Sequence, residues 1–133
     1  MPVDRQRLAT APAAYFEAVD RKDHAGALAF FAKDATFTVQ TANLTLRGHD
    51  EIGSMFRAFF ADYETICHRI ANLVVDERAG KTSTEQDCPH VRNDGTPERL
   101  YTCNFFDFAL DGRFQRVIVW IDGVSPLVAG ETS

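Results

Sequence analysis

The stretch TICHRIANLVVD, residues 65–76, is rich in apolar and β-branched side chains and predicts one long β-strand. Three further strand-like segments follow it, at residues 81–90, 99–110 and 113–122. The short segments between these strands hold the Gly, Asn, Asp and Pro residues that tight turns require. We therefore expect consecutive antiparallel hairpins in the C-terminal half of the chain.

The N-terminal half is predicted to be mainly helical. Apolar side chains recur at helical spacing in segments that we expect to form helices over residues 8–23, from Asp23 to about residues 33–34, and over residues 51–61. Asp23 and Asp50 stand where N-caps belong. Short strands are expected at residues 35–40 and 44–47. Helices followed by a long antiparallel meander predict an α+β domain with the helices on one face of the sheet.

Both faces of the predicted sheet are apolar. In residues 65–76 one alternating set is Ile66, His68, Ile70, Asn72 and Val74, and the other is Cys67, Arg69, Ala71, Leu73 and Val75. Because the helices can cover only one face, the other face is expected to pack against something else. A second or third copy of the chain is the simplest candidate, so we expect a homodimer or homotrimer.

Composition limits the classes of function. The chain has 133 residues, 45% of them hydrophobic and 25% charged, which fits one domain spanning residues 1–133 with a core at 8–122 and a tail at 123–133. The net charge of -5 and the scattered basic residues argue against a nucleic-acid partner. No signal peptide or membrane-length apolar run is evident, so a cytoplasmic protein without membrane contact is expected.

The cysteines and the known sequence motifs do not indicate a particular kind of site. Cys67, Cys88 and Cys103 are widely spaced and form no CxxC pair, so free thiols are expected. The sequence has no phosphate-binding loop, nucleophile elbow or metalloprotease motif. Metal binding by His68 with Asp87 or His90 has no diagnostic spacing, and we predict no metal site and no cofactor.

His68, Asp20 and Tyr15 are the candidate catalytic residues. His68 is placed in the middle of the predicted strand, where a buried imidazole is either a hydrogen-bonded core residue or a functional one. Asp20 follows Phe16 by one helical turn, an unusual site for a carboxylate unless it is solvated or pairs with His68. Tyr15 is either an ordinary core aromatic residue or a residue that flanks a cavity.

The expected substrate-binding residues are Asn104, Phe106, Asp87 and Phe56. Asn104 lies on a strand face with Phe106, as a polar group among aromatic ones. Asp87 and His90 belong to an unusually polar strand in which Pro89 favours an edge position, so both are expected to be mainly exposed. The alternative is that either Asp87 or His90 points into a cavity.

Three stretches carry a resemblance to a known family: AYFEAVDRKDHAGALAFFAKDATF (residues 14–37), LTLRGHDEIGSMFRAFF (44–60) and TICHRIANLVVD (65–76). Over about residues 8–122 the chain resembles the SnoaL-like branch of the nuclear-transport-factor-like superfamily. The resemblance implies a cone-shaped roll, in which three helices pack on the concave face of a curved, mostly antiparallel mixed sheet. It also implies an apolar pocket and oligomerisation through the convex face.

Within the superfamily the sequence is most similar to the subgroup of scytalone dehydratase, bile-acid 7α-dehydratase and hexachlorocyclohexane dehydrochlorinase. That subgroup has an Asp on the first helix that orients a strand His, which correspond here to Asp20 and His68, and Asn72 also fits its pattern. A helix tyrosine of the bile-acid enzyme corresponds to Tyr15. The ketosteroid isomerase pattern is broken, because its carboxylates fall on Val39 and Asn104.

The resemblance implies a cofactor-independent lyase or isomerase that acts on a small apolar polyketide, steroid or aromatic metabolite. If Asp20 accepts the Nδ1 proton of His68, Nε2 is free to take a proton from carbon, while Tyr15 and Asn104 donate hydrogen bonds. The alternative is a non-catalytic small-molecule-binding or oligomerisation domain of the same fold. The first reading requires the two side chains to lie within about 3.2 Å at the wall of a closed cavity.

Overall fold

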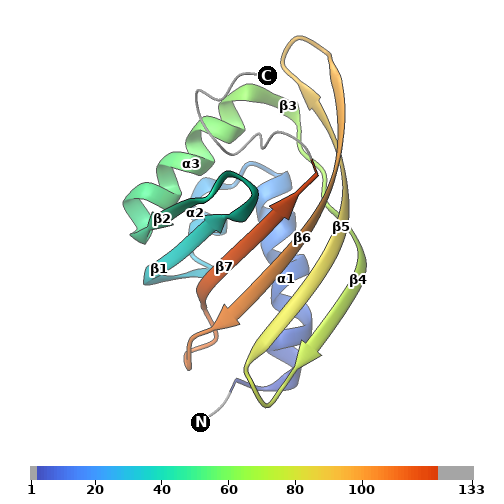
Figure 1. The fold of residues 1–133 in the computed structure, drawn as a ribbon. Coiled ribbons are helices and arrows are strands. Elements are labelled where there is room, and N and C mark those ends of the chain that lie inside the picture. The colour runs from blue at the N-terminus through green and yellow to red at the C-terminus, as the bar shows by residue number, and fades with distance from the viewer. Residues whose placement is uncertain (1–2, 123–133) are drawn as a thin grey trace.

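The computed structural model describes residues 3–122 (Figure 1). The elements in chain order are α1 (Arg5–Asp20), α2 (His24–Leu28), β1 (Phe31–Val39), the short 3-10 helix η1 (Gln40–Ala42), β2 (Leu44–Arg47), α3 (Gly48–Asp62), β3 (Tyr63–Thr65), β4 (Arg69–Asp76), β5 (Lys81–Arg92), β6 (Pro97–Phe108) and β7 (Phe114–Ile121). The expected tail, from Gly123 on, lies outside the described residues.

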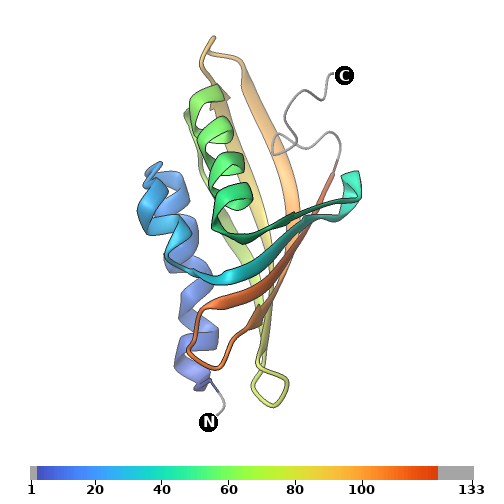
Figure 2. The same cartoon turned by 90° about the vertical axis from the view of Figure 1, so that its left-hand side faces the viewer.

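The strands form a 7-stranded sheet with the order β2-β1-β7-β6-β5-β3, and β4 also pairs with β5. The predicted hairpins are confirmed, since β4–β5, β5–β6 and β6–β7 are all antiparallel. Only β1 and β7 run parallel among the described strands, which makes the sheet mixed. Figure 2 shows the helices gathered on one side of a curved sheet. The α+β class, with three helices on the concave face, is confirmed.

Helix α1 is defined by caps at both ends. The side chain of Asp4 accepts a hydrogen bond from the backbone N–H of Arg7 at 2.8 Å, as an N-cap does. The helix ends at Asp20, and Lys22 then adopts a left-handed backbone with φ 58°, which turns the chain toward α2. Asp20 is therefore the last residue of α1, directly before the turn to α2.

The core between helices and sheet is mostly aromatic. Tyr15 lies at its centre, with ring centroids 5.3 to 6.2 Å from those of Phe31, Phe56, Phe106 and Phe114. The rings meet edge to face, the arrangement that aromatic pairs prefer. This packing joins α1 and α3 to β1, β6 and β7.

The second helix is shorter than predicted. Phe31 was expected in that helix, but it begins β1 and pairs with Phe114 of β7. A short, fully apolar run does not distinguish a buried strand from a buried helix, so the periodicity misplaced this boundary. The third helix begins at Gly48, and Asp50 lies in its first turn instead of capping it.

The expected single strand over residues 65–76 is broken in two. Residues 66–68 pair with no strand, and they separate β3 from β4, so His68 does not lie in mid-strand as predicted. A bulge follows at Ala71, because Ile70 pairs with Gln86 and Asn72 with Glu85. The bulge reverses the predicted alternation beyond it: Leu73 shares the face of buried Thr84, and Asn72 and Val74 lie on the exposed face.

Strand β5 is not an edge strand, contrary to the prediction from Pro89. It pairs with β6 along its length and with β3 and β4 on its other side. On that side β3 ends at Thr65 opposite Val91 and β4 begins at Arg69 opposite Asp87, so Pro89 lies in the gap between these two strands, where its missing N–H is not needed.

The outer face of the sheet carries large exposed apolar side chains: Val74, Tyr101, Phe105 and Trp120. A groove of about 500 Å³ lies beside Tyr101 and Trp120. Figure 2 shows that α1, α2 and α3 do not lie on this side of the sheet. Among the described residues, no helix has the length and apolar character that a membrane crossing demands.

Candidate functional site

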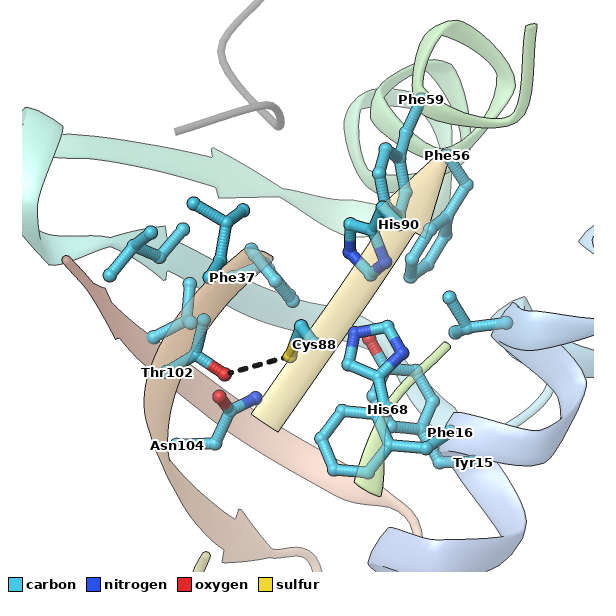
Figure 3. A pocket seen from close by; sticks show the side chains of 14 residues that line it. Tyr15, Phe16, Phe37, Phe56, Phe59, His68, Cys88, His90, Thr102 and Asn104 are labelled. Carbon is cyan, nitrogen blue, oxygen red and sulfur yellow. Dashed lines mark hydrogen bonds between the residues drawn. The ribbon is translucent and has the colours of Figure 1, made fainter. Parts of the chain in front are cut away.

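A small cavity lies between the helices and the concave face of the sheet (Figure 3). Its wall is mainly aromatic and aliphatic, with a few polar groups, and consists of Tyr15, Phe16, Val19, Phe37, Phe56, Phe59, His68, Cys88, His90, Leu100, Thr102, Asn104, Val119 and Ile121. The cavity volume is about 40 Å³. A single water molecule occupies about 10–15 Å³ of a cavity measured in this way, so the cavity holds about three waters.

His68 and Asp20 meet at the wall of this cavity. The imidazole Nδ1 lies 2.6 Å from Oδ1 of Asp20, and the backbone N–H of His68 donates to Oδ2 of the same carboxylate at 2.9 Å. The break in the strand makes the second bond possible, because the N–H of His68 is not used in a sheet ladder. Both oxygens of the Asp20 carboxylate thus bind His68, one through its ring and the other through its backbone.

The imidazole of His68 is fixed in orientation. Its ring stacks on Phe16, with centroids 4.5 Å apart and an angle of 11° between the planes. Because the carboxylate accepts the Nδ1 proton, the neutral ring keeps a free lone pair on Nε2. This is the arrangement of a general base. The structure brings the pair together, and its catalytic role stays a prediction.

Tyr15 lines the cavity from α1 and is 3% exposed. Burial, and secondly the charge of Asp20, raise the pKa of its phenol well above the ordinary value. The phenol therefore remains protonated, and its hydroxyl group keeps its hydrogen. It is free to donate to a ligand.

His90 is a site residue that the sequence placed wrongly at an exposed edge. Its ring is 3% exposed, lines the cavity, and lies 5.4 Å from the ring of His68 between centroids. Nδ1 accepts the backbone N–H of Cys67 at 3.2 Å, so the proton of the neutral ring is on Nε2. Burial, and secondly the neighbouring His68, lower the pKa of His90 to about 4. At neutral pH, the neutral ring of His90 is therefore a donor through Nε2.

Asn104 and Phe56 line the cavity as predicted, whereas Phe106 and Asp87 do not. Phe106 is fully buried behind Phe16, with ring centroids 6.1 Å apart. Asp87 faces away from the cavity and accepts two hydrogen bonds from Arg99, at 2.9 and 2.6 Å. These bonds hold the pKa of its carboxyl below the ordinary value.

Asn72, which also fitted the pattern of the resemblance, lies away from the cavity. It is exposed and donates to Glu85 at 2.6 Å. The bulge at Ala71 accounts for this position, because it shifts Asn72 to the other face of β4.

Two of the cavity residues that the sequence did not place there, Cys88 and His90, lie on one face of β5. Alternate side chains of this strand are all buried, and they are Thr82, Thr84, Gln86, Cys88 and His90. The sequence shows this period of two, but Pro89 favours an edge strand, so a buried face is not predicted from the sequence. Thr102 and Phe59 were missed as well, and both line the cavity.

His68, Cys88 and His90 place one possible metal-ligand atom each within 4.8 Å of one another. Two observations disfavour a metal here. The Nδ1 lone pair of His90 is used by Cys67, which leaves its other nitrogen protonated. Burial raises the pKa of the Cys88 thiol to about 12, so the thiolate that a metal binds is disfavoured. The geometry fits a base and a donor better than a ligand set.

Comparisons with known proteins agree with this fold. A family model described as SnoaL-like domain matches residues 13–117. No curated protein matches the chain by sequence.

Several solved structures are similar in fold. PrhC from Penicillium brasilianum has a TM-score of 0.80 at 16% identity, covering 89% of this chain and 82% of its own. A protein from Xanthomonas campestris, proposed to be a polyketide cyclase, has a TM-score of 0.77 at 24% identity, with coverages of 87% and 90%. An LEH-like epoxide hydrolase of M. tuberculosis has a TM-score of 0.75 at 16% identity, with coverages of 88% and 84%. At these identities the likeness shows the fold alone.

Proposed function

Because the chain belongs to the SnoaL-like domain family, we propose that it is a cofactor-independent lyase or isomerase that takes a proton from a carbon atom of a small, mostly apolar metabolite. One observation carries the proposal: a histidine oriented by a carboxylate, with a free Nε2, at the wall of a small, partly open and mainly apolar cavity. Names of structural neighbours, which include a proposed polyketide cyclase and an epoxide hydrolase, agree with small-molecule chemistry.

The proposed step is an elimination of water from a β-hydroxy carbonyl compound. Nε2 of His68 takes the proton from the carbon next to the carbonyl, and the electron pair of that C–H bond forms the new C=C bond. The hydroxyl on the next carbon leaves with its bonding pair and receives the proton from the imidazolium, so water and an unsaturated ketone result. Asp20 stabilises the imidazolium meanwhile. An isomerase differs only in returning the proton to another carbon.

The donors of the cavity suit the developing oxyanion. The Nε2–H of His90 and the hydroxyl of Tyr15 are both protonated at neutral pH, for the reasons given above. Such fixed donors in an apolar site stabilise negative charge on a carbonyl oxygen. We therefore propose that these two groups hold the carbonyl oxygen while His68 acts.

The size of the cavity orders the candidate substrates. Sites for drug-sized ligands are typically about 300–1,000 Å³, whereas this cavity measures about 40 Å³. A single ring already needs more room than about three waters, so a lining side chain must move to admit it, and a four-ring steroid requires several of them to move. We therefore place single-ring aromatic or short polyketide-type compounds before steroids.

The resemblance to the dehydratase and dehydrochlorinase subgroup is the finer part of the proposal. It rests on Asp20 and His68, which stand in contact. Val39 and Asn104, at the positions of the ketosteroid isomerase carboxylates, cannot act as carboxylates. A dehydratase-like elimination is thus the first choice.

The function is tested with single-ring β-hydroxy ketones, beginning with 3-hydroxycyclopentanone. We expect the protein to form the conjugated enone, seen by its ultraviolet absorbance, or to introduce deuterium next to the carbonyl in D₂O, seen by NMR. Glu17→Gln, on the exposed side of α1, should behave like the wild type. Binding of these ketones with neither water loss nor deuterium uptake would favour the non-catalytic alternative.

We also propose that a second copy covers the outer sheet face. Trp120 is 48% exposed there, and opposite charges stand side by side in the Asp87–Arg99 pair, so two copies of one face can be complementary. A solution mass of two or three chains is expected at micromolar concentration, and Trp120→Glu should reduce it to one. Leu110→Glu, an exposed position in the turn before β7, should not. A monomeric wild type would contradict the proposal.

A further inference from the structure

One buried amide, that of Gln86, holds two side chains of the cavity wall. Gln86 lies on the inward face of β5 and is 2% exposed. Its Nε2 donates to Oγ1 of Thr102 and to Oδ1 of Asn104, each at 2.7 Å. Thr102 and Asn104 both belong to β6 and both line the cavity. Figure 3 shows them side by side, near Cys88.

The orientation of this amide follows from its hydrogen bonds. In the observed orientation both N–H bonds of Gln86 are used, and only the buried Oε1 lacks a partner. Rotating the amide by 180° would let Oε1 accept from Thr102 and from a rotated Asn104, but it would leave two buried N–H groups without partners. An unpaired buried carbonyl is tolerated more often than an unpaired buried N–H. Gln86 is therefore the donor.

The direction of these hydrogen bonds determines whether Thr102 and Asn104 of β6 present donors or acceptors to a ligand in the cavity. Because Oδ1 of Asn104 accepts from Gln86, its Nδ2 is left as a donor for the cavity. Because Oγ1 of Thr102 also accepts, its hydroxyl hydrogen is free to donate, either to a ligand or to Sγ of Cys88 at 3.7 Å. Both polar side chains thus become donors.

We propose that Gln86 is a positioning residue that makes the β6 wall a donor surface and so selects ligands with an acceptor oxygen at Thr102 and Asn104. The proposal rests on the proposed function only in using the same cavity, since it concerns binding and requires no turnover. Gln86 touches no ligand itself; it acts through the two side chains that it holds.

The binding test uses a matched pair of probes. Cyclopentanone and methylenecyclopentane have the same shape, but only the ketone has an acceptor oxygen. Their dissociation constants are measured by ligand-observed NMR titration. The wild type should bind the ketone at least about 10-fold more tightly, which corresponds to the net contribution of about one good hydrogen bond.

Variants of Gln86 should reduce this preference. At a pH above the pKa of its buried carboxyl group, Gln86→Glu only accepts, so Thr102 and Asn104 must donate to it and Asn104 turns its oxygen to the cavity. The ketone preference should then fall about 3-fold or more, and only the part that Tyr15 and His90 supply should remain. Gln86→Met keeps the length of the side chain without polar atoms and should lower the preference about 3-fold or more. Thr84→Val is the matched control, since Thr84 is a buried neighbour on the same face whose hydroxyl has no partner, and it should keep the wild-type preference.

A measurement without ligand tests the same orientation. Both amide protons of Gln86 are hydrogen-bonded and buried, whereas those of Asn104 border the cavity. In the wild-type protein the Gln86 side-chain protons should exchange with solvent at least about 10-fold more slowly than those of Asn104. Equal exchange rates overturn the proposal, and so does a wild type that binds the ketone no better than the alkene.

The outcomes also separate this proposal from the proposed function. His68→Ala should lower turnover by about 10² to 10⁴ and still prefer the ketone. A ketone preference that stays at the wild-type value in both Gln86 variants overturns the role of Gln86 and leaves the role of His68 untouched. Full turnover in His68→Ala overturns the role of His68 as the base and leaves the role of Gln86 untouched.

Discussion

His68→Ala is expected to lower kcat/KM for a true substrate by about 10² to 10⁴, the usual contribution of a general base. The imidazole is the only group at the cavity wall, among the described residues, that has a carboxylate holding one nitrogen and a free lone pair on the other. The cavity donors remain in the variant, so substrate binding should change much less than turnover. The measurement is steady-state kinetics of enone formation.

The variant should stay folded, which keeps the result interpretable. Asp20 still receives the backbone N–H of residue 68, because that bond does not involve the side chain. Thermal unfolding checks this directly. His24→Gln is the matched control, since its ring contacts Gly53 between α2 and α3, away from the cavity. Unchanged turnover in folded His68→Ala would end the proposal of a histidine base.

Asp20→Asn should also lower turnover by about 10² to 10⁴, through the proton position and not through lost shape. The asparagine has one oxygen, where the aspartate uses two to accept from the ring and from the backbone N–H of His68. If that oxygen keeps the backbone N–H, the NH₂ group faces Nδ1 and donates to it. The ring proton then moves to Nε2, and the base is lost, as in the aspartate-to-asparagine change of a serine-protease triad.

The tautomer gives a readout that a purely structural role would not change. Nitrogen-15 NMR of the imidazole distinguishes a proton on Nδ1 from one on Nε2. We expect His68 to carry it on Nδ1 in the wild type and on Nε2 in Asp20→Asn. Glu17→Gln, which neutralises an exposed carboxylate on the same helix, should change neither the tautomer nor kcat/KM. An Asp20→Asn protein with the wild-type tautomer and slow turnover would refute this account.

Much of the fold was within reach of the sequence, because it depends on short-range patterns. Helical spacing, and turns rich in Gly, Asn and Asp, indicated helices followed by a meander, and the hairpins were confirmed. The sequence patterns did not predict the two interruptions of the strand over residues 65–76, because these depend on contacts with other elements. The gap at residues 66–68 and the bulge at Ala71 have no clear signal in the local sequence. They depend on how β4 pairs with β5 and on how His68 contacts Asp20 of α1.

The sequence by itself determined the α+β class and marked Asp20, His68 and Tyr15 as unusual, because polar groups in apolar periodic segments are visible one residue at a time. Only the tertiary structure decided that His90 faces the cavity, that Asp87 faces away and that Gln86 holds Thr102 and Asn104. The reason is physical. The side of a strand on which a residue lies is set by register and bulges, and both are fixed by pairing between distant segments.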